Sequence, residues 1–123
     1  MNDQLVTDMV LKLNRETVSG KIQWVAQQTE PSSLLSGEEI VGLAYKALVR
    51  GKNIRIYKIK KPYHFDLEER IEMVDSFRLE FIDDLGRPEW AIPDDAVIAD
   101  LYYTVTRKAS GADQFMSDFL NEE

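Results

Sequence analysis

The chain has 123 residues, of which 44% are hydrophobic and 30% charged, and this composition is typical of a globular protein with one domain, residues 1–123. The absence of cysteine excludes disulfide scaffolds, thiol catalysis and cysteine-ligated zinc. The formal net charge of −7 disfavours a general nucleic-acid binder, because neutralisation of phosphates dominates that affinity.

The start of the chain carries no basic segment followed by an apolar run, and no apolar stretch anywhere in the chain approaches ~18–20 residues. We therefore expect a cytoplasmic protein that does not span a membrane. Residues 3–18 instead predict an amphipathic helix that Ser19-Gly20 ends. The simplest interpretation is that this helix covers a sheet. The alternative is a docking or dimerisation element, and exposure of Leu11, which lies off the main apolar stripe, would indicate it.

Alternating residues predict a half-buried strand over residues 21–27, and a loop over residues 28–37 follows it. Leu34 and Leu35 interrupt this polar loop, so we expect them to tuck under the sheet edge, with a lid or a partner contact as the alternative. Residues 38–50 fit either a helix or a strand. We favour the strand, in which Gly42 would mark a bulge.

The next segment, residues 53–60, is strongly β-prone and should end at Pro62, because proline cannot continue a ladder from the middle of a sheet. After a polar connection at residues 66–69, alternation predicts a long strand over residues 70–82. The residue types at 83–87 predict a turn, and residues 88–93 predict a short edge strand.

The clearest element is a helix over residues 93–111. Asp94 and Asp95 supply an N-cap, and Ser110-Gly111 supplies a left-handed C-cap. Residues 113–120 predict a second, shorter helix that Asp113 caps. Its apolar side consists of Phe115, Met116, Phe119 and Leu120.

The elements in order read α-β-β-β-β-β-α-α, with short connections between consecutive strands. Such connections predict a five-stranded antiparallel meander. Helices at both ends of the chain would cover one face of this sheet, which makes the fold class α+β.

Basic and acidic residues are separated along the chain. Seven bases and no acid lie between Ile40 and Phe65, and acids dominate from Asp66 to Asp100. Pairing of the central strands would place these charges opposite each other, which is the interpretation we favour. The alternative is a basic patch that binds an anionic partner or single-stranded nucleic acid. The candidate patch consists of six of these bases, Arg50, Lys52, Arg55, Lys58, Lys60 and Lys61.

Catalytic signatures are weak. The acidic turn at residues 83–89 has three carboxylates but lacks the spacing of a calcium loop, and a cation there is an open alternative. His64 is the single histidine, and no serine lies in a nucleophile elbow. We predict no catalytic, cofactor-binding or metal-binding residue. Candidate interface anchors are Trp90, Tyr103, Leu34 and Leu35.

Two stretches carry a resemblance to known sequences. Residues 17–24, TVSGKIQW, and residues 101–107, LYYTVTR, are similar to a junction and a terminal helix of uncharacterised small bacterial and phage-associated domains. The resemblance implies a bacterial α+β domain and no particular activity.

The sequence therefore favours a non-enzymatic protein that binds another macromolecule, and we expect a protein partner, in a regulatory, immunity-like or chaperone-like role. The second hypothesis is a small-ligand binder with a pocket between the sheet and the opening helix. The third is an enzyme that uses carboxylates within residues 83–95, with Arg87 and His64. A homodimer is compatible with each hypothesis.

Overall fold

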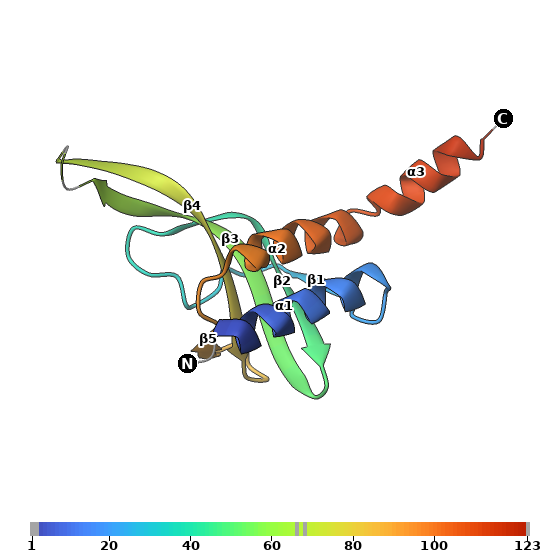
Figure 1. Ribbon diagram of the computed structural model, residues 1–123, viewed down its shortest axis with the longest axis horizontal. Helices are drawn as coiled ribbons and strands as arrows, with labels where there is room; N and C mark the ends of the chain where they lie inside the picture. The colour runs from blue at the N-terminus through green and yellow to red at the C-terminus, as the bar shows by residue number, and fades with distance from the viewer. Residues whose placement is uncertain (1–2, 66, 68, 123) are drawn as a thin grey trace.

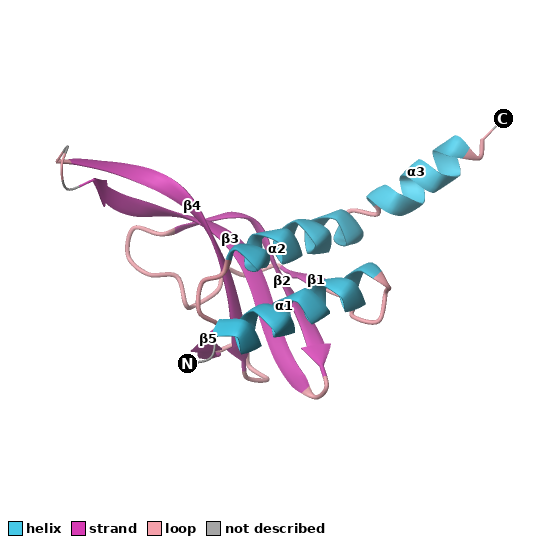
Figure 2. Cartoon of the chain, viewed as in Figure 1, coloured by secondary structure: helices cyan, strands magenta, loops and turns pink. Residues whose placement is uncertain are grey.

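The computed structural model describes residues 3–65, 67 and 69–122 (Figures 1 and 2). Two of the four residues of the predicted connection at residues 66–69, Asp66 and Glu68, lie outside this description. The elements in chain order are α1 (Asp3–Val18), β1 (Val25–Gln27), β2 (Glu39–Val49), β3 (Lys52–Phe65), β4 (Arg70–Ile82), β5 (Pro88–Ala91), α2 (Ala96–Ala109) and α3 (Ala112–Leu120).

The strands form one antiparallel sheet in the order β1-β2-β3-β4-β5. This confirms the predicted α+β class, element order and meander. The β3–β4 hairpin is the longest pair and extends beyond the rest of the sheet as a two-stranded arm (Figure 1). The segment of residues 38–50 forms strand β2 over Glu39–Val49 rather than a helix, and the predicted edge strand ends at Ala91.

Helices α1 and α2 lie side by side on one face of the sheet (Figure 2). Asp95 caps α2 by accepting a hydrogen bond from the Val97 amide (3.1 Å), and it also accepts one from the Thr7 hydroxyl of α1. These two bonds, that from Thr7 above all, lower the pKa of Asp95. The buried core beneath both helices includes Val10, Ile54, Ile56, Leu79, Ile98, Leu101 and Val105.

The segment before β1 differs from its prediction. Residues 21–24 are not strand, because the chain wraps around the end of α1 and the Ile22 amide donates to the Glu16 carbonyl (3.1 Å). Ile22 is buried in the core, and the Trp24 indole donates to the Thr17 hydroxyl (3.0 Å). The alternating pattern therefore predicted which side chains of residues 21–24 are buried, but it wrongly predicted that these residues pair in a strand.

The prediction that β3 ends at Pro62 is wrong, since the strand continues to Phe65. Pairing of β3 with β2 stops at Lys60, so from there β3 has a neighbour only on the β4 side. Proline is tolerated at such an edge, where its missing N–H faces no partner strand. His64 accordingly lies on a strand and not in a loop.

The predicted bulge at Gly42 is confirmed. The register of β2 against β3 shifts between Val41 and Tyr45, and Gly42 has a φ of +73°. A Cβ at this position would also lie 3.5 Å from the Tyr102 hydroxyl of α2. None of the helices in the described part of the chain is long and apolar enough to cross a membrane.

Candidate functional site

Helix α3 exposes its apolar side to solvent. The exposed fractions are 68% for Phe115, 42% for Met116, 63% for Phe119 and 81% for Leu120, and no described residue of α3 is buried. The two phenylalanine rings stack with their centroids 5.9 Å apart. The sequence predicted this helix as part of the sheet cover, but α3 extends away from the body of the molecule (Figure 1).

The start of α3 explains this direction. Gly111 follows α2 in the left-handed conformation, with a φ of +73°. Asp113 does not cap the helix as predicted. It accepts a hydrogen bond from Arg107 (2.7 Å) and forms an ion pair with Lys108 (3.3 Å), and these contacts, with that from Arg107 the larger, lower the pKa of Asp113. The carboxylate thus links α3 to the last turn of α2.

The outer side of α1 carries a shallow apolar hollow of about 340 Å³, lined by Leu11, Asn14, Arg15 and Val18. Leu11 is 40% exposed and Val18 is 56% exposed. Exposure of Leu11 is the sign expected of a docking helix. The hollow occupies the last two turns of α1, whose end meets the end of α2 around a second hollow lined by Thr17, Gly20, Ile22, Gln23, Trp24, Lys108 and Ala109.

The candidate interface anchors do not form one surface. Trp90 is half-exposed on the edge strand β5, where it packs against Phe81 with centroids 5.8 Å apart. Tyr103 is exposed on α2, and its hydroxyl accepts a hydrogen bond from Lys58 (3.2 Å). Leu34 packs into a small cluster on the opposite face of the sheet, whereas the neighbouring Leu35 is exposed.

Most of the six bases of the candidate basic patch pair with carboxylates of β4 and β5. Lys52 pairs with Glu89, and Lys58 and Lys60 each lie 3.6 Å from a carboxylate oxygen of Asp75. The bond from Lys58 to Tyr103 is the first cause of a raised Lys58 pKa, and Asp75 adds to it. Arg55 is buried, as described below. This arrangement supports the structural interpretation of the charge pattern and leaves Arg50 and Lys61 as the bases without such a carboxylate partner among the described residues.

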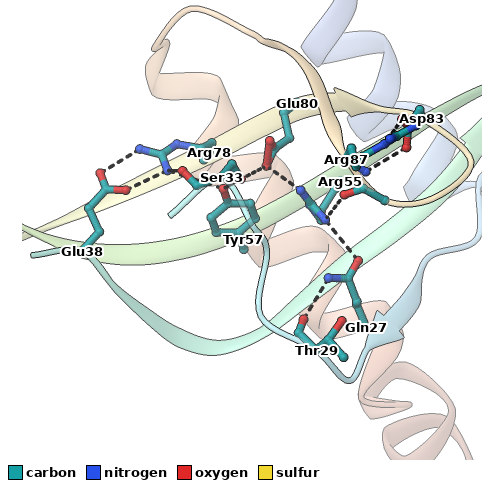
Figure 3. A network of polar contacts seen from close by, with 11 residues as sticks. Gln27, Thr29, Ser33, Glu38, Arg55, Tyr57, Arg78, Glu80, Asp83 and Arg87 are labelled. Carbon is teal, nitrogen blue, oxygen red and sulfur yellow. Dashed lines mark hydrogen bonds and ion pairs between the residues drawn. The ribbon is translucent and has the colours of Figure 1, made fainter. Parts of the chain in front are cut away.

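A buried polar network lies on the face of the sheet opposite α1 and α2, under the loop of residues 28–38 (Figure 3). Arg55 and Glu80 are each 1% exposed and form an ion pair at 3.2 Å. The Ser33 hydroxyl donates to Glu80 (2.7 Å). Since a hydroxyl has one proton, Tyr57 must donate the 2.5 Å bond that it shares with Ser33. Burial raises the pKa of Tyr57.

Arg78 extends the network to the end of the same loop. Its two terminal nitrogens donate to both oxygens of Glu38 at 2.9 and 2.8 Å, which is a bidentate pair. These bonds lower the pKa of Glu38 and raise that of Arg78. The network thus ties residues 28–38 down onto β3 and β4. Its groups bind one another, which favours a structural role.

A polar hollow of about 410 Å³ lies beside this network. It is lined by Gln27, Thr29, Glu30, Ser32, Lys46, Arg55, Asp84, Leu85, Gly86 and Arg87. Arg55 lines its floor, where it donates to the Gly86 carbonyl (3.0 Å) and the Gln27 amide oxygen (3.4 Å). The Arg55 Nε is buried without a hydrogen-bond partner.

The space between the sheet and α1, where a ligand pocket was hypothesised, is filled by side chains. Val10 of α1, Ile56 of β3 and Leu101 of α2 meet there and are each 0% exposed. Nothing in this packing favours a small-ligand site.

The carboxylates of the acidic turn are engaged within the protein. Asp83 accepts hydrogen bonds from the Leu85 and Arg87 amides and from Arg87 Nε (2.7 Å), and those from Arg87 contribute most to a lowered Asp83 pKa. Asp84 accepts from Asn53 (3.0 Å), and Glu89 pairs with Lys52. Within the described ranges, no three histidine or acidic side chains are grouped so that they could hold a metal ion.

No family model matches the chain, and no curated protein or solved structure is significantly similar to it. The geometry alone defines the class of the protein. It is an α+β sheet domain whose last helix, α3, exposes an apolar side.

Sequence reasoning identified the apolar side of α3 but assigned it to the core. The signal that could have separated the two is length, because a nine-residue helix after a glycine break has little reach back to the sheet. Reasoning also missed that Arg55 is buried. Its partner, Glu80, is one of the acidic residues of β4, but only the register of β3 against β4 shows that Arg55 and Glu80 lie opposite each other.

Proposed function

We propose that this protein functions by binding another protein, with the apolar side of α3 as the anchor, and not by catalysis. The observation that carries the proposal is that four large apolar side chains share one side of α3 and none is buried. The four side chains line one side of the helix, as the apolar anchors do in helices that insert into grooves of partner proteins. A cytoplasmic location and a bacterial source belong to the same proposal.

The energetics support an anchor of useful strength. Complete burial of a leucine, phenylalanine or methionine side chain stabilises by about 1.5–3 kcal/mol. The exposed fractions of the four side chains therefore leave roughly 4–8 kcal/mol to be gained on docking. An exposed apolar side of this size is typical of interaction sites in soluble proteins.

Site-specific photo-crosslinking in cells that encode the protein tests this proposal. A benzophenone amino acid replaces Phe119 in one variant and Gln114, on the polar side of the same helix, in a matched control. We expect a light-dependent adduct with a polypeptide at position 119 that position 114 does not give. Equal or absent adducts at both positions would refute the proposal.

A further inference from the structure

We infer that the partner of α3 is a second copy of this chain, and that the two copies exchange α3 helices reciprocally, each helix seating in the α1 hollow (Leu11, Asn14, Arg15 and Val18) of the other. This inference rests on the proposed function, because it names the protein that α3 binds.

The two surfaces match in length and chemistry. The α1 hollow extends over eight helical residues, about 12 Å, and α3 has nine residues, about 14 Å. Leu11 and Val18 offer exposed apolar contact on one surface, and Phe115 and Phe119 offer it on the other.

The charges of the two surfaces are complementary. Helix α3 and the residue pair after it carry three acids and no base, and since Asp113 pairs with Arg107 and Lys108 of its own chain, Asp118 and Glu122 remain for a second copy. Residues 11–24 carry three bases and one acid. Of those bases, Arg15 and Lys21 make no ion pair with another described residue. An acidic apolar helix facing a basic apolar hollow defines orientation as well as affinity.

Reciprocal exchange also satisfies the area that a stable dimer needs. On a scale of 150–250 Å² per aromatic side chain, the four residues of α3 expose roughly 450 Å². One helix and the hollow that it covers would bury roughly 900 Å², which is below the range of stable interfaces. Two symmetric contacts would bury roughly 1,800 Å², which is within the 1,200–2,000 Å² of standard interfaces.

Closure of α3 onto its own α1 is opposed by the first turn of α3. Asp113 holds that turn against Arg107 and Lys108, and this contact directs the helix away from the body. In this orientation α3 points away from the body of its own chain (Figure 1), and the α1 hollow is open to a second copy.

Light scattering and cross-linking test the inference together. We expect the wild-type chain to have twice the monomer mass of 14.2 kDa, and Phe115→Ser/Phe119→Ser to raise the dimer dissociation constant roughly 100-fold. Because the chain has no cysteine, a tagged Val18→Cys chain and an untagged Phe119→Cys chain can be mixed with a short bismaleimide linker. They should form a mixed dimer, whereas Ser117→Cys, on the opposite side of α3, should not.

Three outcomes would overturn the inference. A monomeric wild type whose position 119 photo-crosslinks to a different protein would end it and leave the proposed function intact. A monomeric wild type without any photo-adduct would end both. If two Phe119→Cys chains were linked to each other and no mixed dimer formed, the helices would pack against each other and not in the α1 hollow.

Discussion

The buried pair of Arg55 and Glu80 allows a quantitative prediction about what holds the 28–38 loop in place. Glu80→Ala removes the carboxylate that Arg55 and Ser33 contact, and it leaves a guanidinium that is 1% exposed without its counter-charge. Breaking a buried pair in this way costs about 3–5 kcal/mol. For a chain of this length, that loss lowers the melting temperature by about 12–20 °C.

Two further variants isolate the cause. Arg55→Met/Glu80→Leu removes both charges and should recover most of the lost stability, because paired apolar replacements of buried ions are often neutral. Glu89→Ala breaks the exposed pair with Lys52, whose side chains are 45% and 44% exposed, and should cost less than about 1 kcal/mol.

Urea denaturation followed by circular dichroism and tryptophan fluorescence gives the free energy of unfolding of each variant. The reasoning would be refuted if Glu80→Ala and Glu89→Ala lost similar stability. It would also be refuted if the double apolar variant were as unstable as Glu80→Ala, since the penalty would then not arise from an uncompensated charge.

Three further predictions follow from the same structure. Arg78 lowers the pKa of Glu38, so this pair stabilises the fold at pH values above 4.5, the ordinary pKa of a glutamate. The stabilisation is lost as the pH falls through the lowered pKa of Glu38 in the folded state. Urea titrations should therefore show Glu38→Gln less stable than wild type at pH 7 but equal to it at strongly acid pH; a constant difference would contradict this. Gly42→Val should destabilise by about 1–3 kcal/mol, because a valine cannot adopt a φ of +73° without strain, and a neutral effect in thermal melts would disprove the strained bulge. Phe115→Ser/Phe119→Ser should leave the stability of the dissociated monomer within about 0.5 kcal/mol of wild type, and a larger loss in melts at low concentration would assign α3 to the core.

Local chemistry explains which parts of the fold were predictable. The caps at Asp95 and Gly111 and the bulge at Gly42 depend on one or two residues, so the sequence displays them directly. Pro62 was misjudged because its tolerance depends on whether β2 still runs alongside, which is a property of the sheet and not of the strand.

The candidate site was less predictable for a similar reason. The periodicity of Phe115 and Phe119 shows that α3 has an apolar side, but not what covers that side. Burial of Arg55 depends on the loop of residues 28–38 folding over it, which places Ser33 within reach of Glu80. Both facts arise from tertiary contacts between segments distant in sequence, and no local pattern records them.

Hydrogen–deuterium exchange of the α3 amides at several protein concentrations tests the central claim most directly. An undocked nine-residue helix is marginally stable in water, so its protection reports docking. The account predicts that amides of α3 and of the last two turns of α1 are protected at high concentration and that those of α3 lose protection on dilution. Protection of α3 that does not change on dilution would show docking within one chain, and exchange without protection at every concentration would show that α3 of the purified protein docks on nothing, itself included.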